Sequence, residues 1–190
     1  MQEKEWKWLV TKERFEALLH LAEYFAQTKG STRLQLNHYY DTIDRKIAAQ
    51  NICVRIRQTE SGLLGTVKKH GDSGTSEETG FRVETLPRFI TYEACLAHRL
   101  GVLVTQRTDF AVGEIATLSF DRNFYLGETD YEIGLEFLEE KETESLAEWY
   151  RACFPTGCLR SKYERFLTAL DRLERERETD KRVIGERNAQ

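Results

Sequence analysis

Residues 3–8 read Glu-Lys-Glu-Trp-Lys-Trp, and this alternation decides the fold expected of the whole chain. In an extended strand, successive side chains point to opposite faces. One face therefore carries Glu3, Glu5 and Lys7, and the other carries Trp6 and Trp8. The tryptophan face requires a large apolar surface to pack against. If the charged face also looks inward, it lines a polar cavity, where the carboxylates suit a hard cation and the lysine suits an anion.

The same alternation of apolar and charged side chains recurs along the chain. Taken singly, each such segment is an ordinary amphipathic strand with its polar face in water, because charged side chains are mostly exposed. As a set they are unusual, because their charged faces are rich in Arg and Glu and each strand carries mainly one sign of charge. The segments lie at residues 35–41, 54–57, 66–68, 81–84, 118–121 and 131–137.

The length and composition of the chain indicate one cytoplasmic domain. Its 190 residues, of which 40% are hydrophobic, suffice for a single core. No apolar run reaches the length of a membrane span, and the first residues do not resemble a secretory signal. The net charge of −4 argues against broad binding of nucleic acids. The cysteines lack metal-binding spacing, so we expect reduced and mostly buried thiols at Cys53, Cys95, Cys153 and Cys158.

The periodicity of the sequence predicts eight strands, with helices at both ends and one in the middle. We expect the strands near residues 2–10, 32–43, 51–60, 63–70, 76–86, 102–111, 114–124 and 127–139. We expect the helices over residues 11–28, 91–100 and 145–154, and from Ser161 onward. Beyond Leu173 nearly every residue is charged, which predicts a domain over residues 1–173 and a frayed or disordered tail over 174–190.

These elements predict an α+β fold built on a closed barrel. Short turns join most of the strands, so the sheet is mainly antiparallel, and eight strands can close around one small ligand. The charged faces then line the inside, and the apolar faces pack outward against the helices. The outward set comprises Trp6, Trp8, Val54, Ile56, Val67, Val83, Phe120, Ile133 and Leu135.

The expected lining of the barrel combines basic and acidic residues. The basic members are Lys7, Arg55, Arg57, Lys68, Arg82, Arg107 and Lys162, and the acidic members are Glu3, Glu5, Glu84, Asp121, Glu132 and Glu136. Such a mixture could pair internally and have no further role. The acids, however, lie on the first and last strands, and the bases concentrate on the middle strands. Carboxylates select Mg²⁺ or Mn²⁺, and arginines bind phosphate oxygens, so this segregation predicts a site for a metal-chelated phosphate chain.

The ordered set of charged motifs resembles the CYTH superfamily, also called the triphosphate tunnel metalloenzymes. Glu3-x-Glu5-x-Lys7 is similar to the ExExK signature of that family, and the similarity spans about residues 2–170 in the expected order. It is most similar to the bacterial stand-alone members of the bacillus type. The further matching positions are Tyr39 to Thr42, Arg55-x-Arg57, Thr66-x-Lys68, Arg82-x-Glu84, Arg107, Asp121, Glu132 to Glu136, and Ser161 to Tyr163.

The resemblance implies an eight-stranded antiparallel tunnel that binds triphosphate compounds with Mg²⁺ or Mn²⁺. It implies that the metal ligands are Glu3, Glu5, Glu132 and Glu136, with Asp121 as a helper. It implies that the phosphate-binding residues are Lys7, Arg55, Arg57, Lys68, Arg82, Arg107 and Lys162, among which Lys7 and Lys68, together with Glu136, are also catalytic candidates. Related chains often carry a further acid where this chain has Gly134, which weakens the expectation of two metal ions.

The function predicted from these features is metal-dependent hydrolysis of a triphosphate compound, such as inorganic tripolyphosphate. A basic wall would neutralise charge on the leaving group, and a water oriented by a carboxylate such as Glu136 would attack the terminal phosphorus. Two alternatives stay open: an adenylate cyclase of class IV, and a non-catalytic sensor of polyphosphate or nucleotides. The expected partner is a small triphosphate compound rather than a membrane or nucleic acid, and the chain is expected to be a monomer or homodimer.

Overall fold

The computed structural model describes residues 4–70, 76–114, 116–137 and 160–187. One antiparallel sheet dominates this part of the chain, in the order β1-β9-β8-β7-β2-β3-β4-β5, with β6 paired to β7. The strands are β1 (Lys4–Val10), β2 (Ser31–Asp41), β3 (Ile52–Thr59), β4 (Gly62–His70), β5 (Ser76–Arg82), β6 (Phe89–Tyr92), β7 (Cys95–Val112), β8 (Ala116–Tyr125) and β9 (Glu128–Phe137). The helices are α1 (Lys12–Ala26), the short 3₁₀ helix η1 (Ala48–Gln50) and α3 (Lys162–Arg187).

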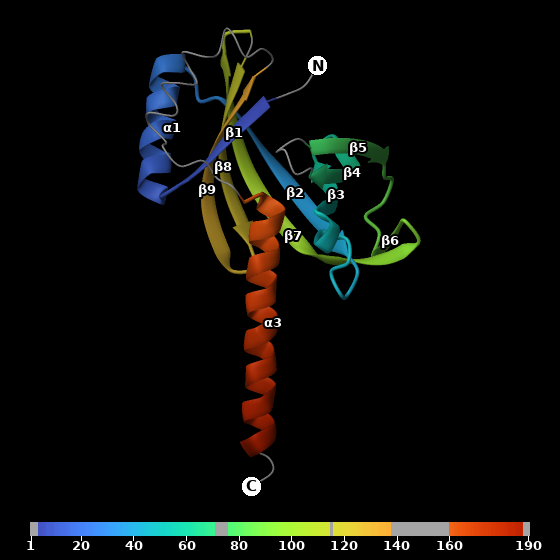
Figure 1. The fold of residues 1–190 in the computed structure, drawn as a ribbon. Helices are drawn as coiled ribbons and strands as arrows, with labels where there is room; N and C mark the ends of the chain where they lie inside the picture. Colours follow the sequence, from blue (N-terminus) through green and yellow to red (C-terminus); the bar gives the residue numbers. More distant parts are fainter. Residues whose placement is uncertain (1–3, 71–75, 115, 138–159, 188–190) are drawn as a thin grey trace.

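The sheet is curled but open, so a closed barrel is not confirmed. Among the described residues, no backbone pairing joins β5 to β1, and these strands form the two edges of the sheet. The curl nevertheless brings the two ends near each other (Figure 1). Lys7 on β1 contributes to lowering the pKa of Lys68 on β4, although five strands lie between them in the sheet order.

The helix predicted over residues 91–100 is wrong, because this segment forms a β-hairpin. Strand β6 ends at Tyr92, and the long strand β7 begins at Cys95 and pairs with it. The two residues of the turn, Glu93 and Ala94, both have positive φ angles (43° and 63°), as a tight two-residue hairpin turn requires. This hairpin supplies a ninth strand where eight were expected.

The apolar side chains predicted to face outward lie in two clusters on one face of the sheet. On one half of the sheet, α1 covers a cluster that contains Trp8, Phe120, Ile133 and Leu135, and Phe15 of α1 is buried among them. Helix α1 begins with the Thr11 side chain, which accepts a hydrogen bond from the Arg14 backbone N–H at 3.3 Å. The sheet therefore has an apolar outer face on the side that α1 packs against.

On the other half of the sheet, a second cluster lies on the same outer face. It contains Val54 and Ile56 of β3 and Tyr40 of β2, all nearly inaccessible to solvent. Val83 and Ile90, from the end of β5 to the β6 hairpin, are partly buried against it. The hairpin thus covers part of the outer face, where the sequence predicts packing against helices.

Helix α3 packs at one end of the opposite, charged face. Its Phe166 is fully buried against Tyr39 and Leu103, and the Tyr163 hydroxyl donates to Asp41 at 3.0 Å. A Cβ atom at Gly101 would lie 2.9 Å from the Phe166 ring, so this glycine permits the close approach of the helix. The contact places the first turn of α3 beside the charged strands.

Helix α3 continues through the charged stretch to Arg187 (Figure 1). An ion pair between Arg172 and Glu176, one turn apart, is typical of a solvent-exposed helix. The division into a domain over residues 1–173 and a tail over 174–190 stays a prediction. The helix predicted over residues 145–154 lies outside the described residues, as do Cys153 and Cys158.

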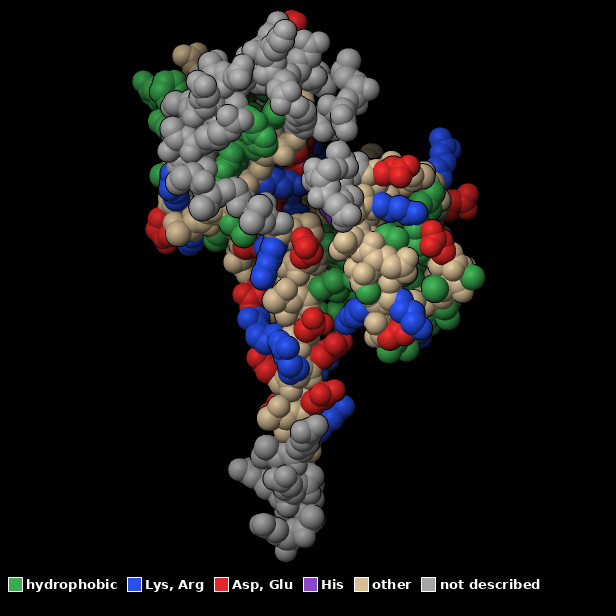
Figure 2. All heavy atoms as spheres, viewed as in Figure 1, with side chains coloured by type: hydrophobic (Ala, Val, Ile, Leu, Met, Phe, Trp, Pro, Cys, Tyr) green, Lys and Arg blue, Asp and Glu red, His purple; other side chains and the backbone are tan. Residues whose placement is uncertain are grey.

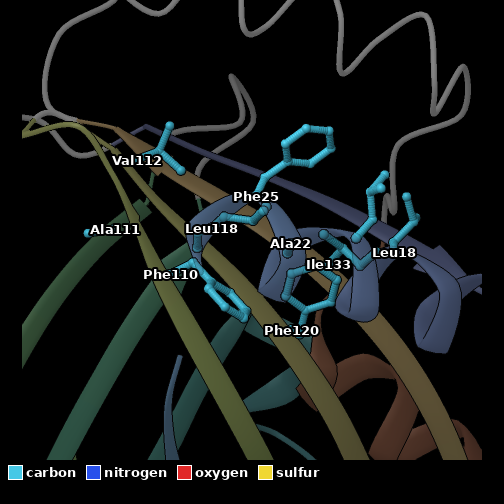
Figure 3. Close-up of a pocket in the computed structure, with 11 residues that line it drawn as sticks. Leu18, Ala22, Phe25, Phe110, Ala111, Val112, Leu118, Phe120 and Ile133 are labelled. Atoms are coloured by element: carbon cyan, nitrogen blue, oxygen red, sulfur yellow. The ribbon is translucent and has the colours of Figure 1, made fainter. Parts of the chain in front are cut away.

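The outer face also carries an apolar groove between α1 and the sheet, with a volume of about 360 Å³ (Figure 3). Leu18, Ala22 and Phe25 of α1 lie on one side, and Phe110 and Leu118 of the sheet lie on the other. The groove offers almost no polar group and lies on the face opposite the predicted charges. No helix within the described part of the chain is both long and apolar enough to cross a membrane.

We expect the outer-face core to dominate stability. Replacing Ile133, which has no exposed surface, by alanine should lower the free energy of unfolding by about 2–5 kcal/mol, because a buried cavity is left behind. The matched change at Ile43, which is 81% exposed, should cost less than about 0.5 kcal/mol. Urea denaturation followed by circular dichroism measures both, and equal losses would contradict this assignment of the core.

Candidate functional site

The register of the sheet gathers the predicted charged residues on one face, which we call the charged face. Glu5 lies opposite Glu136, and Asp121 lies between Glu132 and Arg107 across neighbouring strands. Figure 2 shows basic and acidic side chains in a hollow above the start of α3. The charged face carries Glu5, Lys7, Arg55, Arg57, Lys68, Arg82, Arg107, Asp121, Glu132 and Glu136.

One half of the charged face, which we call the acidic half, contains the carboxylates of Asp121, Glu132 and Glu136. Arg107 lies at its centre. Its Nε and Nη2 donate to the two oxygens of Asp121, both at 2.7 Å, in a bidentate pair. Its Nη1 donates to Glu136 Oε1 at 3.2 Å. All three side chains start from the neighbouring strands β7, β8 and β9, so the register of the sheet brings them together.

Lys162 extends this network from α3. Its ammonium donates to Asp121 Oδ2 at 2.5 Å and to Glu132 Oε1 at 2.8 Å. Asp121 and Glu132 are only 2% and 1% exposed, so both carboxylates depend on these cations for compensation. The prediction that Lys162 joins the lining from the last helix agrees with this position.

The electrostatics keep these acids ionised at neutral pH. Burial by itself raises the pKa of Asp121, but Lys162 and Arg107 outweigh it and hold the pKa well below its ordinary value. For Glu132, burial likewise opposes ionisation, and Lys162 and Arg165 more than reverse it, so its pKa is also lowered. Lys162 itself has a raised pKa, because Glu132 and Asp121 outweigh the effect of burial.

The other half of the charged face, which we call the basic half, contains Arg55, Arg57 and Lys68 and has fewer counter-charges. Arg55 donates to Glu78 at 3.1 Å, and Lys68 lies 3.9 Å from the same carboxylate. Arg57 donates through Nε to the neutral Asn37 at 3.0 Å. Within the described chain, the buried Nε of Arg55 has no hydrogen-bond partner. This half therefore offers guanidinium and ammonium groups to an external anion.

Mutual repulsion and burial also show in the protonation of the basic half. Burial, followed by the charges of Arg55 and Arg107, lowers the pKa of Arg57 to about 10. Burial, followed by the charge of Lys7, lowers the pKa of Lys68. Arg57 stays cationic at neutral pH, and a bound anion would relieve the repulsion among these groups.

The remaining predicted residues are less tightly fixed. Lys7 and Glu5, neighbours on one face of β1, form an ion pair at 2.6 Å. Arg82 is exposed on the edge strand β5, opposite Leu64. Glu84 is an exposed residue just beyond that strand. Glu3 lies outside the described residues, so the first position of the ExExK motif is not tested.

The acids present suit a divalent metal by donor chemistry, although most of their oxygens are engaged. Within the described residues, no three His, Cys, Asp or Glu side chains are grouped so that they could hold a metal ion. Glu5 and Glu136 face each other across β1 and β9, are partly accessible, and offer the oxygen ligands that Mg²⁺ and Mn²⁺ prefer. These two residues would hold the ion, whereas both oxygens of Glu132 and of Asp121 already accept from cations.

Gly134 leaves a gap beside this pair of acids. A Cβ atom there would lie 3.7 Å from Glu5 Oε1 and 3.9 Å from Ser119 Cβ, which are ordinary contact distances. The backbone thus has room for a side chain that would point at Glu5. The absence of an acid at this position explains in part why no group of three carboxylates forms within the described part of the chain.

The sequence reading missed three members of the site, namely Glu78, Asp130 and Arg165. Asp130 shares a face with Glu132 on β9, so the two-residue period could have found it. Arg165 lies three residues after Lys162 and therefore on the same side of α3. Glu78 lies within the strand expected over residues 76–86, but only the pairing of β4 with β5 places it opposite Lys68.

Comparisons with known proteins show which domain family and which solved structures the chain is similar to. The CYTH domain family profile matches residues 1–154. A protein from Bacillus halodurans, described as a proposed adenylate cyclase, has a similar structure at 26% identity with a TM-score of 0.67, covering 87% of this chain and 99% of that chain. No curated protein is significantly similar in sequence.

Two further structures share the fold at lower identity. A Hippeastrum protein described as a proposed adenylyl cyclase with a dominant triphosphatase activity is 19% identical with a TM-score of 0.68, covering 88% of this chain and 96% of that one. The PH1819 protein of Pyrococcus horikoshii is 14% identical with a TM-score of 0.58, covering 87% of this chain and 98% of that one. At these identities the likeness shows the fold alone.

The pKa of Arg57 predicts a pH dependence of anion binding. A cation whose pKa is lowered to about 10 keeps its charge at neutral pH and loses it as the pH rises through that value. Affinity for inorganic tripolyphosphate without metal should therefore be high near neutral pH and fall several-fold between about pH 8 and pH 10.5. Isothermal titration calorimetry in the presence of a chelator measures it.

The control for this prediction is a pair of substitutions. Arg57→Gln should bind the anion more weakly at neutral pH and show a flatter pH dependence, because the titrating cation is gone. Arg172→Gln, on the exposed side of α3, should behave as the unaltered protein does. A pH dependence that is the same with and without Arg57 would refute the prediction.

Proposed function

The chain belongs to the CYTH domain family, and from that premise we propose that it hydrolyses compounds carrying a triphosphate, such as inorganic tripolyphosphate, with the help of Mg²⁺ or Mn²⁺. Proteins of this family are triphosphatases or cyclases, act on triphosphate compounds, and in general depend on a divalent metal. The observation that carries the proposal is the division of the charged face into an acidic half and a basic half that has fewer counter-charges among the described residues.

The basic half suits the phosphate chain. Among the residues that the structure describes, Arg55, Arg57 and Lys68 together have one carboxylate ion-pair partner, Glu78, which is itself 43% exposed. A linear triphosphate carries several negative charges in a row, and guanidinium groups bind its oxygens in pairs. Lys7, across the opening of the curled sheet from Lys68, can contact the same chain from the other edge.

The acidic half suits the reacting end of the substrate. In the free protein, Arg107 and Lys162 bind carboxylates of the charged face. When substrate binds, the two cations would move to its phosphate oxygens. A divalent cation held by Glu5 and Glu136 would neutralise charge on the phosphate oxygens and activate water. Glu136, which is partly exposed, can accept a proton from an attacking water.

The Hippeastrum relative supports hydrolysis, since its reported dominant activity is that of a triphosphatase. The Bacillus halodurans relative keeps cyclisation of ATP as a second candidate, since it is described as a proposed adenylate cyclase. The two reactions differ in the nucleophile, which is water in one and the ribose 3′ oxygen in the other. Incubation with ATP and Mn²⁺ separates them, because a cyclase yields cyclic AMP and pyrophosphate, and a hydrolase yields ADP and phosphate.

Removing a charge at the metal or phosphate contacts should abolish most turnover. Lys7→Ala and Glu5→Gln should each lower kcat for tripolyphosphate at least about a hundredfold, because each removes a contact to charge that develops in the transition state. Phosphate release with Mg²⁺ and then Mn²⁺ measures it. Lys12→Ala, which removes an exposed lysine at the start of α1, is the control and should retain activity. Near-normal turnover of either site variant would rule out this site.

Metal and phosphate should bind cooperatively. Glu136 accepts from Arg107 in the free protein, so a phosphate chain that draws this cation away leaves a carboxylate oxygen free for the metal that Glu5 and Glu136 would hold. We expect the affinity for Mn²⁺ to rise at least about tenfold when a non-hydrolysable imidotriphosphate is present, which corresponds to a coupling free energy of about 1.4 kcal/mol. Calorimetric titration of Mn²⁺ with and without the analogue tests this, and equal affinities would contradict it.

A further inference from the structure

Arg165 stands out among the described residues near the site, because none of the charged motifs assigns it a role. It is 8% exposed and lies on α3, one turn after Lys162. Its Nη2 donates to Glu132 Oε2 at 2.8 Å, its Nε donates to Asp130 Oδ2 at 2.8 Å, and its Nη1 donates to the carbonyl of Arg160 at 2.9 Å. One guanidinium thus ties the start of α3 to strand β9.

The anchor of Arg165 on β9 is itself held firmly. Asp130 accepts a hydrogen bond from Asn123 at 2.8 Å and another from the Tyr125 hydroxyl at 2.7 Å. Asn123 in turn accepts from Thr105 at 2.7 Å. A buried and satisfied polar network of this kind is rigid, because each broken bond leaves a polar group unpaired. Arg165 therefore approaches Glu132 from a fixed position.

The two oxygens of Glu132 are divided between the two cations of α3. Arg165 takes Oε2, and Lys162 takes Oε1. Because Arg165 fixes the plane of the carboxylate, Oε1 has one direction in which to hold the Lys162 ammonium, beside Asp121. The ammonium of a lysine is a point charge on a flexible stem, so its position depends on the groups that bind it.

We propose that Arg165 is a positioning residue of the site, which orients Glu132 and through it sets where the Lys162 ammonium stands before substrate arrives. The inference rests on the proposed function and names what organises it. Arg165 does not touch the phosphate chain in this scheme; it acts through Glu132. A lysine at position 165 keeps the charge but cannot reach Glu132, Asp130 and the Arg160 carbonyl at once, because it lacks the planar fork of arginine.

The test is a double-mutant cycle between Arg165→Lys and Lys162→Ala, with tripolyphosphate and saturating Mg²⁺ or Mn²⁺. In the otherwise unaltered protein, Arg165→Lys should lower kcat about tenfold or more while KM changes less, because a preorganised contact is lost. In the Lys162→Ala background, the same change should lower kcat less than about twofold further. Equal losses in both backgrounds would overturn the inference, because a merely structural role would act in both.

The matched control is Arg172→Lys, the same replacement on an exposed part of α3 where Arg172 contacts Glu128. It should leave kcat unchanged. Circular dichroism and thermal melting report whether Arg165→Lys is folded. If Arg165→Lys is not folded, Asp130→Asn replaces it in the cycle. This change weakens the anchor of Arg165 and leaves Glu132 and Lys162 in place. We expect it to lower kcat several-fold, and this loss should vanish in the Lys162→Ala background.

A parallel binding experiment keeps this inference separable from the proposed function. The heat of binding of imidotriphosphate is measured for the four proteins of the cycle in the presence of a chelator. If the unaltered protein hydrolyses tripolyphosphate but Arg165→Lys equals it in kcat and in affinity, the inference falls and the function stands. If no protein hydrolyses the compound, the proposed function falls, and the inference is decided by whether the affinity loss at Arg165 depends on Lys162.

Discussion

The pairing of Asp121 with Arg107 and Lys162 is the interaction on which the rest of the charged face depends. A carboxylate with 2% exposure is costly unless it is both paired and hydrogen-bonded, and Asp121 receives three donors from two cations. Those cations come from β7 and from α3, so a single buried carboxylate joins the middle of the sheet to the last helix. If either cation were removed, the buried carboxylate would lose part of the pairing that compensates for its desolvation.

The two halves of the charged face differ in how far their charge is compensated. In the acidic half, acids and bases pair one with another and with little surplus. In the basic half, Arg57 contacts a neutral amide, and Arg55 and Lys68 share Glu78. The surplus of positive charge there shows in the lowered pKa values of Arg57 and Lys68, to which both burial and neighbouring cations contribute. A bound anion would relieve this repulsion.

The apolar groove under α1 lies on the face of the sheet opposite the charged residues. Its walls are almost entirely aliphatic and aromatic side chains, and the charged residues point away from it through the sheet. The separation follows from the two-residue period of the strands, which sends alternate side chains to opposite faces. The same two-residue period therefore produces both the apolar outer face and the charged inner face of the sheet.

The sequence by itself determined the period of the strands, and hence which residues share a face. The outward burial of Trp8, Ile56 and Ile133 and the inward grouping of Arg107 and Glu132 follow from alternation, which is local and can be read from the chain. The motif order was likewise sufficient to predict the CYTH family.

Only the tertiary structure decided which charges meet. The hairpin at Glu93 and Ala94 replaced a predicted helix, because two left-handed residues and the pairing with β7 outweigh the local helix propensity of that segment. The contacts of Arg165 depend on where α3 packs, which rests on Phe166 meeting Gly101 across more than sixty residues of chain. Such contacts are set by distance in space and leave no periodic signal in the sequence, so alternation could place Glu132 on the correct face but could not show which cations hold it.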